Sequence, residues 1–67
     1  MSKPSDFYPG QRVMYVPMHA YGNVRHPDCE EGVVSSVNEK YVFVSYIKNG
    51  RTQHTTQATD ADDLLAR

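Results

Sequence analysis

The sequence predicts an all-β domain, a five-stranded small barrel with one short 3-10 or helical turn before the last strand. Residues 41–47 form an almost unbroken run of β-branched and aromatic side chains, which is typical of a strand. Asn49-Gly50 follows this run and supplies the two positive-φ residues that a type I′ hairpin turn requires. The other strand-like segments are also short, and closure into a barrel removes the unpaired edges that an open sheet would expose.

The chain begins with a polar segment, residues 1–6, which we expect to be a flexible tail in front of one domain spanning residues 7–67. Residues 11–18 form the first predicted strand and carry apolar side chains on both faces. The second face therefore needs cover from a neighbouring segment or from a partner. Pro17 has no N–H to donate to a ladder, so we expect it at an edge or a bulge.

A long loop, residues 19–31, separates the first strand from a second one at residues 32–38. Loops of about 12 residues without secondary structure are uncommon and are often functional. This loop carries two of the three histidines and the only cysteine. After the hairpin turn, we expect residues 51–57 to return as one polar, Thr-rich strand.

The C-terminal segment is rich in acids. Thr59 is the expected N-cap of a helical turn that contains the aspartates of residues 60–63, because carboxylates favour the positive end of the helix dipole. One of the two following leucines, Leu64 or Leu65, is expected to fill the core. A short closing strand then ends the chain.

Size and composition limit the possible functions. A domain of 67 residues buries only roughly 60% of its unfolded surface, so a metal ion or a partner subunit would help to stabilise it. Seven Lys and Arg against eight Asp and Glu provide no basic excess for non-specific nucleic-acid binding. One cysteine allows no internal disulfide and, without a signal peptide, suits the reducing cytoplasm. No apolar run approaches the ~20 residues that span a membrane.

The long loop contains a candidate metal site. His26 and Cys29 have a His-x2-Cys spacing, His19 is close enough along the chain to be a third ligand, and His54 is a candidate fourth. Thiolate and imidazole ligands together suit zinc. The alternative is that these are ordinary loop residues, with Cys29 acting as a small buried apolar side chain.

The sequence offers little for catalysis. Cys29 with a histidine could form a nucleophilic pair, but this needs a pocket and oxyanion donors that a domain of this size seldom builds. Neither Ser35 nor Ser36 lies in a nucleophile-elbow motif that would make it a partner for His54. We therefore expect a protein that is not an enzyme and that has no catalytic residues and no obligate cofactor.

The aromatic residues are candidates for binding a partner. If Val42 and Val44 point inward, strand alternation turns Tyr41 and Phe43 outward. Four interpretations are open: an interface between subunits, a core buried on both faces, base stacking on a nucleic acid, or an aromatic cage for a methylated cation. The aromatic side chains concerned are Tyr15, Tyr21, Tyr41, Phe43 and Tyr46.

Three segments of the chain form a recognisable pattern. They are Gly-Gln-Arg-Val at residues 10–13, the strand pair that begins with Gly-Val-Val at residues 32–34 and continues with Tyr-Val-Phe-Val at residues 41–44, and the terminal Asp-Leu at residues 63–64. In these segments the chain resembles SH3-like small barrels, the group that includes Tudor and KOW domains. The resemblance implies a five-stranded barrel over most of residues 9–67. The whole chain is also similar to uncharacterised small barrels encoded by bacteria and their phages.

The layout also resembles the type II dihydrofolate reductases, SH3-like barrels that assemble as tetramers around one pore. The Val-Gln-Ile-Tyr strand of that family corresponds to residues 52–55 here, of which only Gln53 matches, because His54 and Thr55 replace the Ile and Tyr. No equivalent of the pore lysine can be placed. The resemblance therefore implies assembly from copies of the chain rather than reductase activity.

Together these observations predict a small accessory or adaptor protein that acts through protein–protein contact, with a further copy of itself as the first expected partner. The expected partner-binding residues are Tyr21, Asp28, Tyr41, Phe43 and His54. The alternative is a nucleic-acid-binding barrel that uses Arg12, Arg25, Lys48 and Arg51 together with aromatic side chains.

Overall fold

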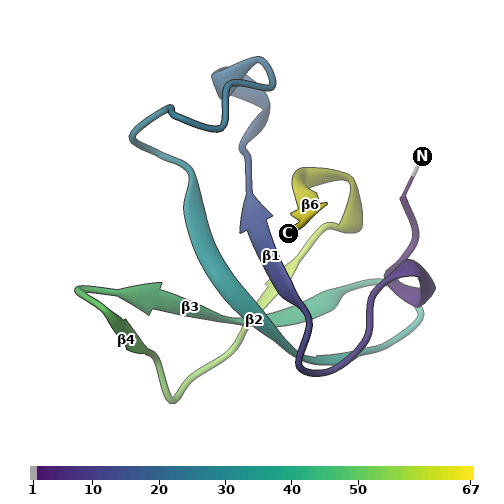
Figure 1. Cartoon of the computed structure of the whole chain (residues 1–67). Helices are drawn as coiled ribbons and strands as arrows, with labels where there is room; N and C mark the ends of the chain where they lie inside the picture. Colours follow the sequence, from purple (N-terminus) through teal and green to yellow (C-terminus); the bar gives the residue numbers. More distant parts are fainter. Residues whose placement is uncertain (1) are drawn as a thin grey trace.

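The computed structural model describes residues 2–67; Met1, the first residue of the predicted tail, lies outside them. These residues form an antiparallel β-structure with three 3-10 turns and no α-helix (Figure 1). The strands are β1 (Arg12–Tyr15), β2 (Glu30–Val37), β3 (Val42–Lys48), β4 (Arg51–Thr52), β5 (Gln57–Thr59) and β6 (Leu64–Ala66). The 3-10 turns are η1 (Pro4–Asp6), η2 (Met18–Ala20) and η3 (Ala61–Asp63). Within this described part, no helix is long and apolar enough to cross a membrane. The predicted all-β class and the short turn before the last strand are confirmed.

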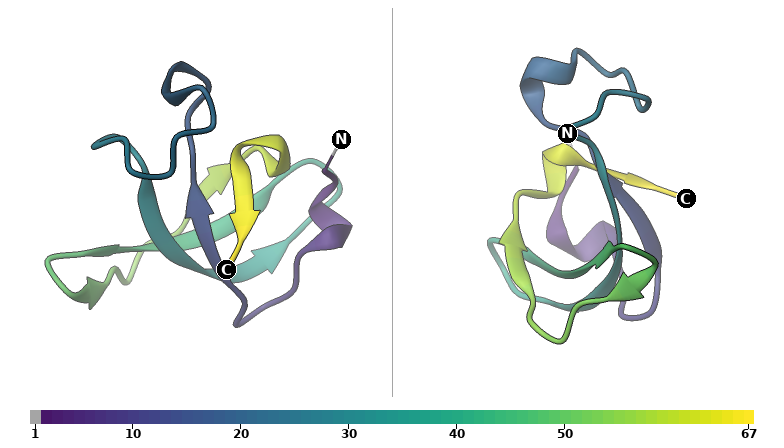
Figure 2. Two further views of the ribbon diagram at one scale, coloured as in Figure 1. Left: turned by 45° about the horizontal axis from the view of Figure 1, so that its top comes forward. Right: turned by 90° about the vertical axis from the view of Figure 1, so that its left-hand side faces the viewer.

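The strands form one sheet in the order β4-β3-β2-β1-β6, and β5 pairs with the first half of β3. β4 pairs with the last two residues of β3, so β4 and β5 share the edge of β3 that faces away from β2. The sheet curves strongly around its core (Figure 2). No pairing joins β6 to β5 within residues 2–67, and the sheet is not closed into a barrel. The five-stranded barrel is therefore not confirmed, because the structure has six strands in a curved, open sheet.

The central hairpin forms as predicted at its turn but not along its return strand. Asn49 and Gly50 have φ angles of 53° and 77°, as a type I′ turn requires. The single strand expected over residues 51–57 is instead interrupted, because only Arg51–Thr52 pairs here and pairing resumes at Gln57–Thr59. Residues 53–56 are all polar and exposed. The backbone N–H of Gln53 still donates to the carbonyl oxygen of Tyr46 at 2.8 Å, but without a buried face the following residues are not held in register against β3.

The first strand is shorter than predicted. It ends at Tyr15, and the next backbone N–H, that of Val16, donates to the carbonyl oxygen of Asp63 at 2.8 Å instead of continuing a ladder. Pro17 has no N–H and starts the bend into η2, as expected for a proline at the end of a strand. The second strand begins two residues earlier than predicted, at Glu30.

The main core fills the concave side of the sheet. Val42 and Val44 are fully buried, whereas Tyr41 keeps 43% of its surface exposed and Phe43 is half-buried, so the predicted alternation on β3 is confirmed. The buried members of this core are Phe7, Val13, Val34, Val42, Val44, Tyr46, Ala61 and Leu64. Leu64 is thus the leucine that fills the core, while Leu65 remains 49% exposed.

A second, smaller core covers the other face of β1. Met14, Val16 and Ala20 are buried together, and half-buried Cys29 packs against them. The long loop between β1 and β2 supplies Ala20 and Cys29, so this loop is the neighbour that the two-faced apolar pattern requires.

The turn before β6 is capped by a different residue from the one predicted. The Oδ1 atom of Asp60 accepts a hydrogen bond from the backbone N–H of Asp62 at 3.0 Å, so Asp60 caps η3. Thr59 cannot serve as the cap because it ends β5 and its side chain is buried, with its hydroxyl 2.7 Å from the hydroxyl of Tyr46.

Replacing Gly32 with alanine tests how closely β2 and β3 approach each other. A Cβ atom at Gly32 would lie 2.5 Å from Cγ1 of Val44 and 3.1 Å from Cδ1 of Tyr46. We expect Gly32→Ala to lower the free energy of unfolding by about 1–3 kcal/mol, measured by urea denaturation, because the core must shift to accept the methyl group. Ser36→Ala, at an exposed position of the same strand, is the control and should change it by less than about 0.5 kcal/mol. Equal stability of the two variants would contradict this packing.

Candidate functional site

Three adjoining hollows mark one surface of the protein. The tyrosine hollow, of about 340 Å³, is lined by Tyr15, Glu30, Tyr46, Gln57, Ala58, Thr59, Asp60 and Asp63. The Met18 groove, of about 300 Å³, is lined by Val16, Pro17, Met18, Gly22, Asp62, Asp63 and Leu65. The His19 hollow, of about 300 Å³, is lined by Tyr15, Pro17, His19, Pro27, Asp28 and Glu30. Because each pair of hollows shares lining residues, the three form one continuous surface.

This surface, the acidic surface below, carries an excess of negative charge. Of the eight Asp and Glu residues in the chain, five line it: Asp28, Glu30, Asp60, Asp62 and Asp63. No Lys or Arg of residues 2–67 lines the three hollows. Lys48 approaches from outside, with its Nζ atom 3.6 Å from Oε1 of Glu30, and offsets one of these charges. A negative potential concentrated in hollows attracts cationic groups.

Tyr46 forms the floor of the tyrosine hollow. It belongs to the inward row of β3, and its hydroxyl lies 2.7 Å from Oγ1 of Thr59. The rings of Tyr15 and Tyr46 meet edge to face, with their centroids 6.1 Å apart. Burial raises the pKa of Tyr46 above its ordinary value of 10.0; the hydrogen bond to Thr59 lowers it, and the negative charge of Glu30 raises it further. The Tyr46 hydroxyl is therefore neutral at pH 7. The carboxylates that line the same hollow are Glu30, Asp60 and Asp63.

The 3-10 turn η3 presents three aspartates at the boundary between the tyrosine hollow and the Met18 groove. Asp60 caps the turn, and Oδ1 of Asp62 accepts a hydrogen bond from the backbone N–H of Ser2 at 2.8 Å. Within residues 2–67, the Asp63 carboxylate has neither a hydrogen-bond donor nor a basic partner. Burial, followed by repulsion from Asp60 and Asp62, raises the pKa of Asp63 above its ordinary value of 3.8. The negatively charged form of Asp63 is therefore destabilised in the folded protein.

The Met18 groove is the apolar part of the surface. Met18 is 86% exposed and Leu65 is 49% exposed, although both are large apolar side chains. Leu65 belongs to β6, which pairs with β1 on one edge only within residues 2–67. The other edge of β6 is therefore unpaired within the described residues, and its backbone donors and acceptors are available to an added strand.

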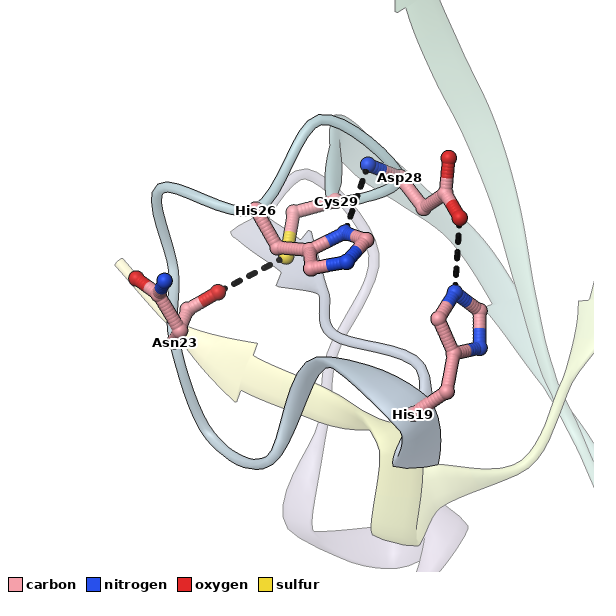
Figure 3. Close-up of polar contacts among 5 residues, drawn as sticks. All are labelled: His19, Asn23, His26, Asp28 and Cys29. Atoms are coloured by element: carbon pink, nitrogen blue, oxygen red, sulfur yellow. Dashed lines mark hydrogen bonds and ion pairs between the residues drawn. The ribbon is translucent and has the colours of Figure 1, made fainter.

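The loop between β1 and β2 rises above the sheet and gathers the histidine cluster, His19, His26 and Asp28 (Figure 3). Nε2 of His19 is 2.6 Å from Oδ2 of Asp28, and the rings of His19 and His26 meet edge to face at 5.2 Å. One potential ligand atom from each of the three residues lies within 4.8 Å of the other two. Two of the predicted metal ligands, His19 and His26, are thus brought together, with Asp28 as the third member.

The other two predicted ligands lie elsewhere. Cys29 turns its Sγ atom toward the carbonyl oxygen of Asn23, at 3.3 Å, and packs against the second core (Figure 3). His54 was expected on the return strand but lies in the irregular segment of residues 53–56. That segment, between β4 and β5, is at the opposite end of the molecule from the loop (Figures 1 and 2).

The predicted partner-binding residues are spread over the molecule. Asp28 lines the acidic surface, whereas Tyr21, which is 93% exposed, lies on the loop beside it. Tyr41 and Phe43 belong to the outer side of the β3 hairpin and line none of the three hollows.

Sequence reasoning missed most of the acidic surface. The aspartates of η3 were interpreted as a helix-capping signal, and nothing in the chain indicated that they meet two tyrosines from β1 and β3. The excess of acids near the C-terminus was the one available signal. Comparisons with protein-family models, with curated proteins and with solved structures find no match to this chain.

The strained position of Asp63 predicts a pH-dependent stability. Because its pKa is higher in the folded than in the unfolded protein, ionisation weakens folding as pH rises from 3.8 to the raised value, and the loss persists at neutral pH. We expect Asp63→Asn to raise the melting temperature at pH 7. This gain should disappear below pH 3.8, where the carboxyl group is neutral in both states.

Thermal unfolding followed by circular dichroism over this pH range measures the effect. Glu39→Gln removes an exposed carboxylate outside the three hollows and serves as the control, with no gain expected. A lower melting temperature for Asp63→Asn at pH 7 would contradict the assignment.

Proposed function

We propose that this protein is a non-enzymatic adaptor that binds an extended, basic segment of a partner protein on its acidic surface. The observation that carries the proposal is that Asp63 lines both the tyrosine hollow and the Met18 groove. A charged hollow and an apolar groove therefore adjoin each other. One partner segment can therefore place a cationic and an apolar side chain in neighbouring hollows. We infer a partner with Lys or Arg next to an aliphatic residue.

The tyrosine hollow suits the cationic side chain. Two tyrosine rings offer cation–π attraction, worth about 0.5–1 kcal/mol at exposed sites and about 2 kcal/mol when water is excluded. Glu30, Asp60 and Asp63 supply opposite charges around the same hollow. A bound cation would also relieve the repulsion that raises the pKa of Asp63.

The Met18 groove suits the apolar side chain. Burying an aliphatic side chain contributes about 1.5–3 kcal/mol, and Met18 adds a flexible side chain that can adapt to different partners. The free edge of β6 can pair with an extended backbone beside the groove. Side-chain recognition and backbone pairing would then act on one segment.

Charge distribution favours this function over the nucleic-acid-binding alternative. Two of the four basic residues assigned to that alternative are close to carboxylates: Arg12 lies 4.0 Å from Glu31, and Lys48 lies 3.6 Å from Glu30. An acidic surface would repel a phosphate backbone. The basic residues are therefore better explained as a solvated rim.

Self-association, which the sequence also predicts, would use a different surface from the acidic one. Tyr41, 43% exposed, and half-buried Phe43 leave an aromatic strip on the outer side of β3 that a second copy could cover. We also propose that the fold is related to the SH3-like barrels, which is supported by the strand order and by the 3-10 turn that precedes β6.

A selection from an unbiased peptide library against the untagged protein tests the proposal. We expect enriched peptides to combine Lys or Arg with a nearby aliphatic residue. Fluorescence titration of these peptides should show binding weakened by up to about fivefold in Asp63→Asn, which removes one carboxylate from the tyrosine hollow, and by about tenfold or more in Leu65→Ser, which removes an apolar side chain from the Met18 groove. Higher salt should weaken binding further.

Matched controls separate the surface from general effects. Glu39→Gln removes a carboxylate and Tyr41→Ser an exposed apolar side chain away from the hollows, and both should bind as the unchanged protein does. Enrichment of acidic peptides, full binding by both Asp63→Asn and Leu65→Ser, or steeply salt-dependent binding to single-stranded DNA would overturn the adaptor assignment. The melting temperature of Asp63→Asn, measured as described above, distinguishes a loss of binding from unfolding.

A further inference from the structure

We propose that the histidine cluster, His19, His26 and Asp28, binds a divalent transition-metal ion of the zinc class. This site lies at the His19 end of the acidic surface, and it uses neither the tyrosine hollow nor the Met18 groove, which hold the partner segment in the proposed function. Two of its ligands, His19 and His26, were predicted from the sequence. Asp28 is the third ligand, and the predicted ligands Cys29 and His54 are not part of the cluster.

The distances within the cluster are close to those of a metal site. Two ligands bound at about 2.0–2.1 Å to one tetrahedral ion lie roughly 3.3–3.5 Å apart. The three ligand atoms here lie within 4.8 Å of one another, and His19 and Asp28 already touch at 2.6 Å. Small side-chain rotations therefore suffice to bring all three onto one ion. His19 and Asp28 are free to make them, because about 60% of each side chain is exposed.

The backbone around the cluster is held in place by its own turns. The N–H groups of Asn23, His26 and Cys29 donate to the carbonyl oxygens three residues earlier, at 2.9–3.0 Å. Ala20 follows His19 and is buried in the second core, and Cys29 follows Asp28 and packs there too. The ligands are thus attached to a fixed frame, which lowers the entropy lost when an ion orders them.

Cys29 takes part in this frame instead of the ligand set. Its S–H group donates to the carbonyl oxygen of Asn23, and its side chain contacts the second core. A half-buried thiol that is bound to a backbone carbonyl stabilises the loop and is not among the proposed ligands.

His26 determines how an ion would enter. Its Nδ1 atom accepts a hydrogen bond from the backbone N–H of Asp28 at 3.0 Å, so the neutral ring carries its proton on Nε2. An ion must either take the place of this N–H at Nδ1 or bind Nε2 after the proton moves to Nδ1. In both routes the hydrogen bond between Asp28 N–H and His26 Nδ1 is lost and a coordination bond forms. The direct contact between His19 and Asp28 is likewise replaced by two coordination bonds to the same ion.

The donor set indicates the kind of ion. Two imidazoles and one carboxylate are borderline ligands that suit Zn²⁺ and its first-row neighbours, whereas Mg²⁺ and Ca²⁺ prefer oxygen ligands. Three protein ligands leave at least one position for water. The His19 hollow adjoins two of the ligands and also contains Glu30, whose carboxylate can accept a hydrogen bond from such a water. An ion here would clamp η2 to the start of β2 and stabilise a chain that has no disulfide.

Isothermal titration of the untagged, chelator-treated protein with Zn²⁺ tests the site. We expect one ion per chain, and binding at least about tenfold weaker in His19→Gln, His26→Gln and Asp28→Asn. His54→Gln is the matched control, which removes a histidine far from the loop, and it should leave the affinity unchanged. Circular dichroism without metal confirms that each variant is folded.

Cobalt provides a second measurement that identifies the ligands. Co²⁺ bound to this protein should show ligand-field absorption without the thiolate-to-cobalt charge-transfer band that a Cys29 ligand would produce, and Zn²⁺ should shift the backbone amide resonances of residues 19–29. Absence of one-to-one Zn²⁺ binding, equal affinity in His26→Gln, or a thiolate charge-transfer band would overturn the assignment to His19, His26 and Asp28.

Discussion

The close approach of β2 and β3 at Gly32 is the constraint on which the rest of the structure depends. Gly32 pairs with Val13 on one side and with Tyr46 on the other, so it lies in the middle of the sheet. A side chain here would occupy the space of Val44 and of the Tyr46 ring. Because this space is left open, Tyr46 can enter the core, where its hydroxyl meets Thr59 and its ring meets Tyr15. The position of Tyr46 in the tyrosine hollow thus depends on the absence of a side chain at Gly32.

Folding and binding place opposite demands on η3. The turn needs Asp60 as its cap and Leu64 in the core, and both roles favour a compact C-terminus. Asp62 and Asp63 add negative charge that the fold neutralises little, and the raised pKa of Asp63 reflects the unfavourable balance. Charges that weaken a fold are often explained by a binding role, and a cationic partner would supply the missing countercharge. The proposed function therefore gives a physical reason for an otherwise unfavourable arrangement.

The loop between β1 and β2 combines a packing role with a chemical one. Its apolar residues, Ala20 and Cys29, pack against Met14, on the second face of β1, and against Val16, which follows the strand. Without the loop, these side chains would be exposed to solvent. Packing of these residues also brings His19 next to Asp28, although nine positions separate them in the chain. A loop that must complete a core cannot move freely, and this is the condition that a preorganised ligand set requires.

The sequence by itself determined the local features of this protein. Asn49-Gly50 can adopt two positive φ angles with little strain, and the alternation of residues 42–46 assigns Val42 and Val44 to the core, because both are properties of neighbouring residues. Only the tertiary structure decided which distant groups meet. The break at residues 53–56 and the choice of Asp60 over Thr59 as cap depend on contacts between strands. The replacement of Cys29 by Asp28 in the histidine cluster depends on how the loop folds onto the second core. The acidic surface has the same origin, since its tyrosines and carboxylates come from four separate segments, and no local pattern encodes how these pack together.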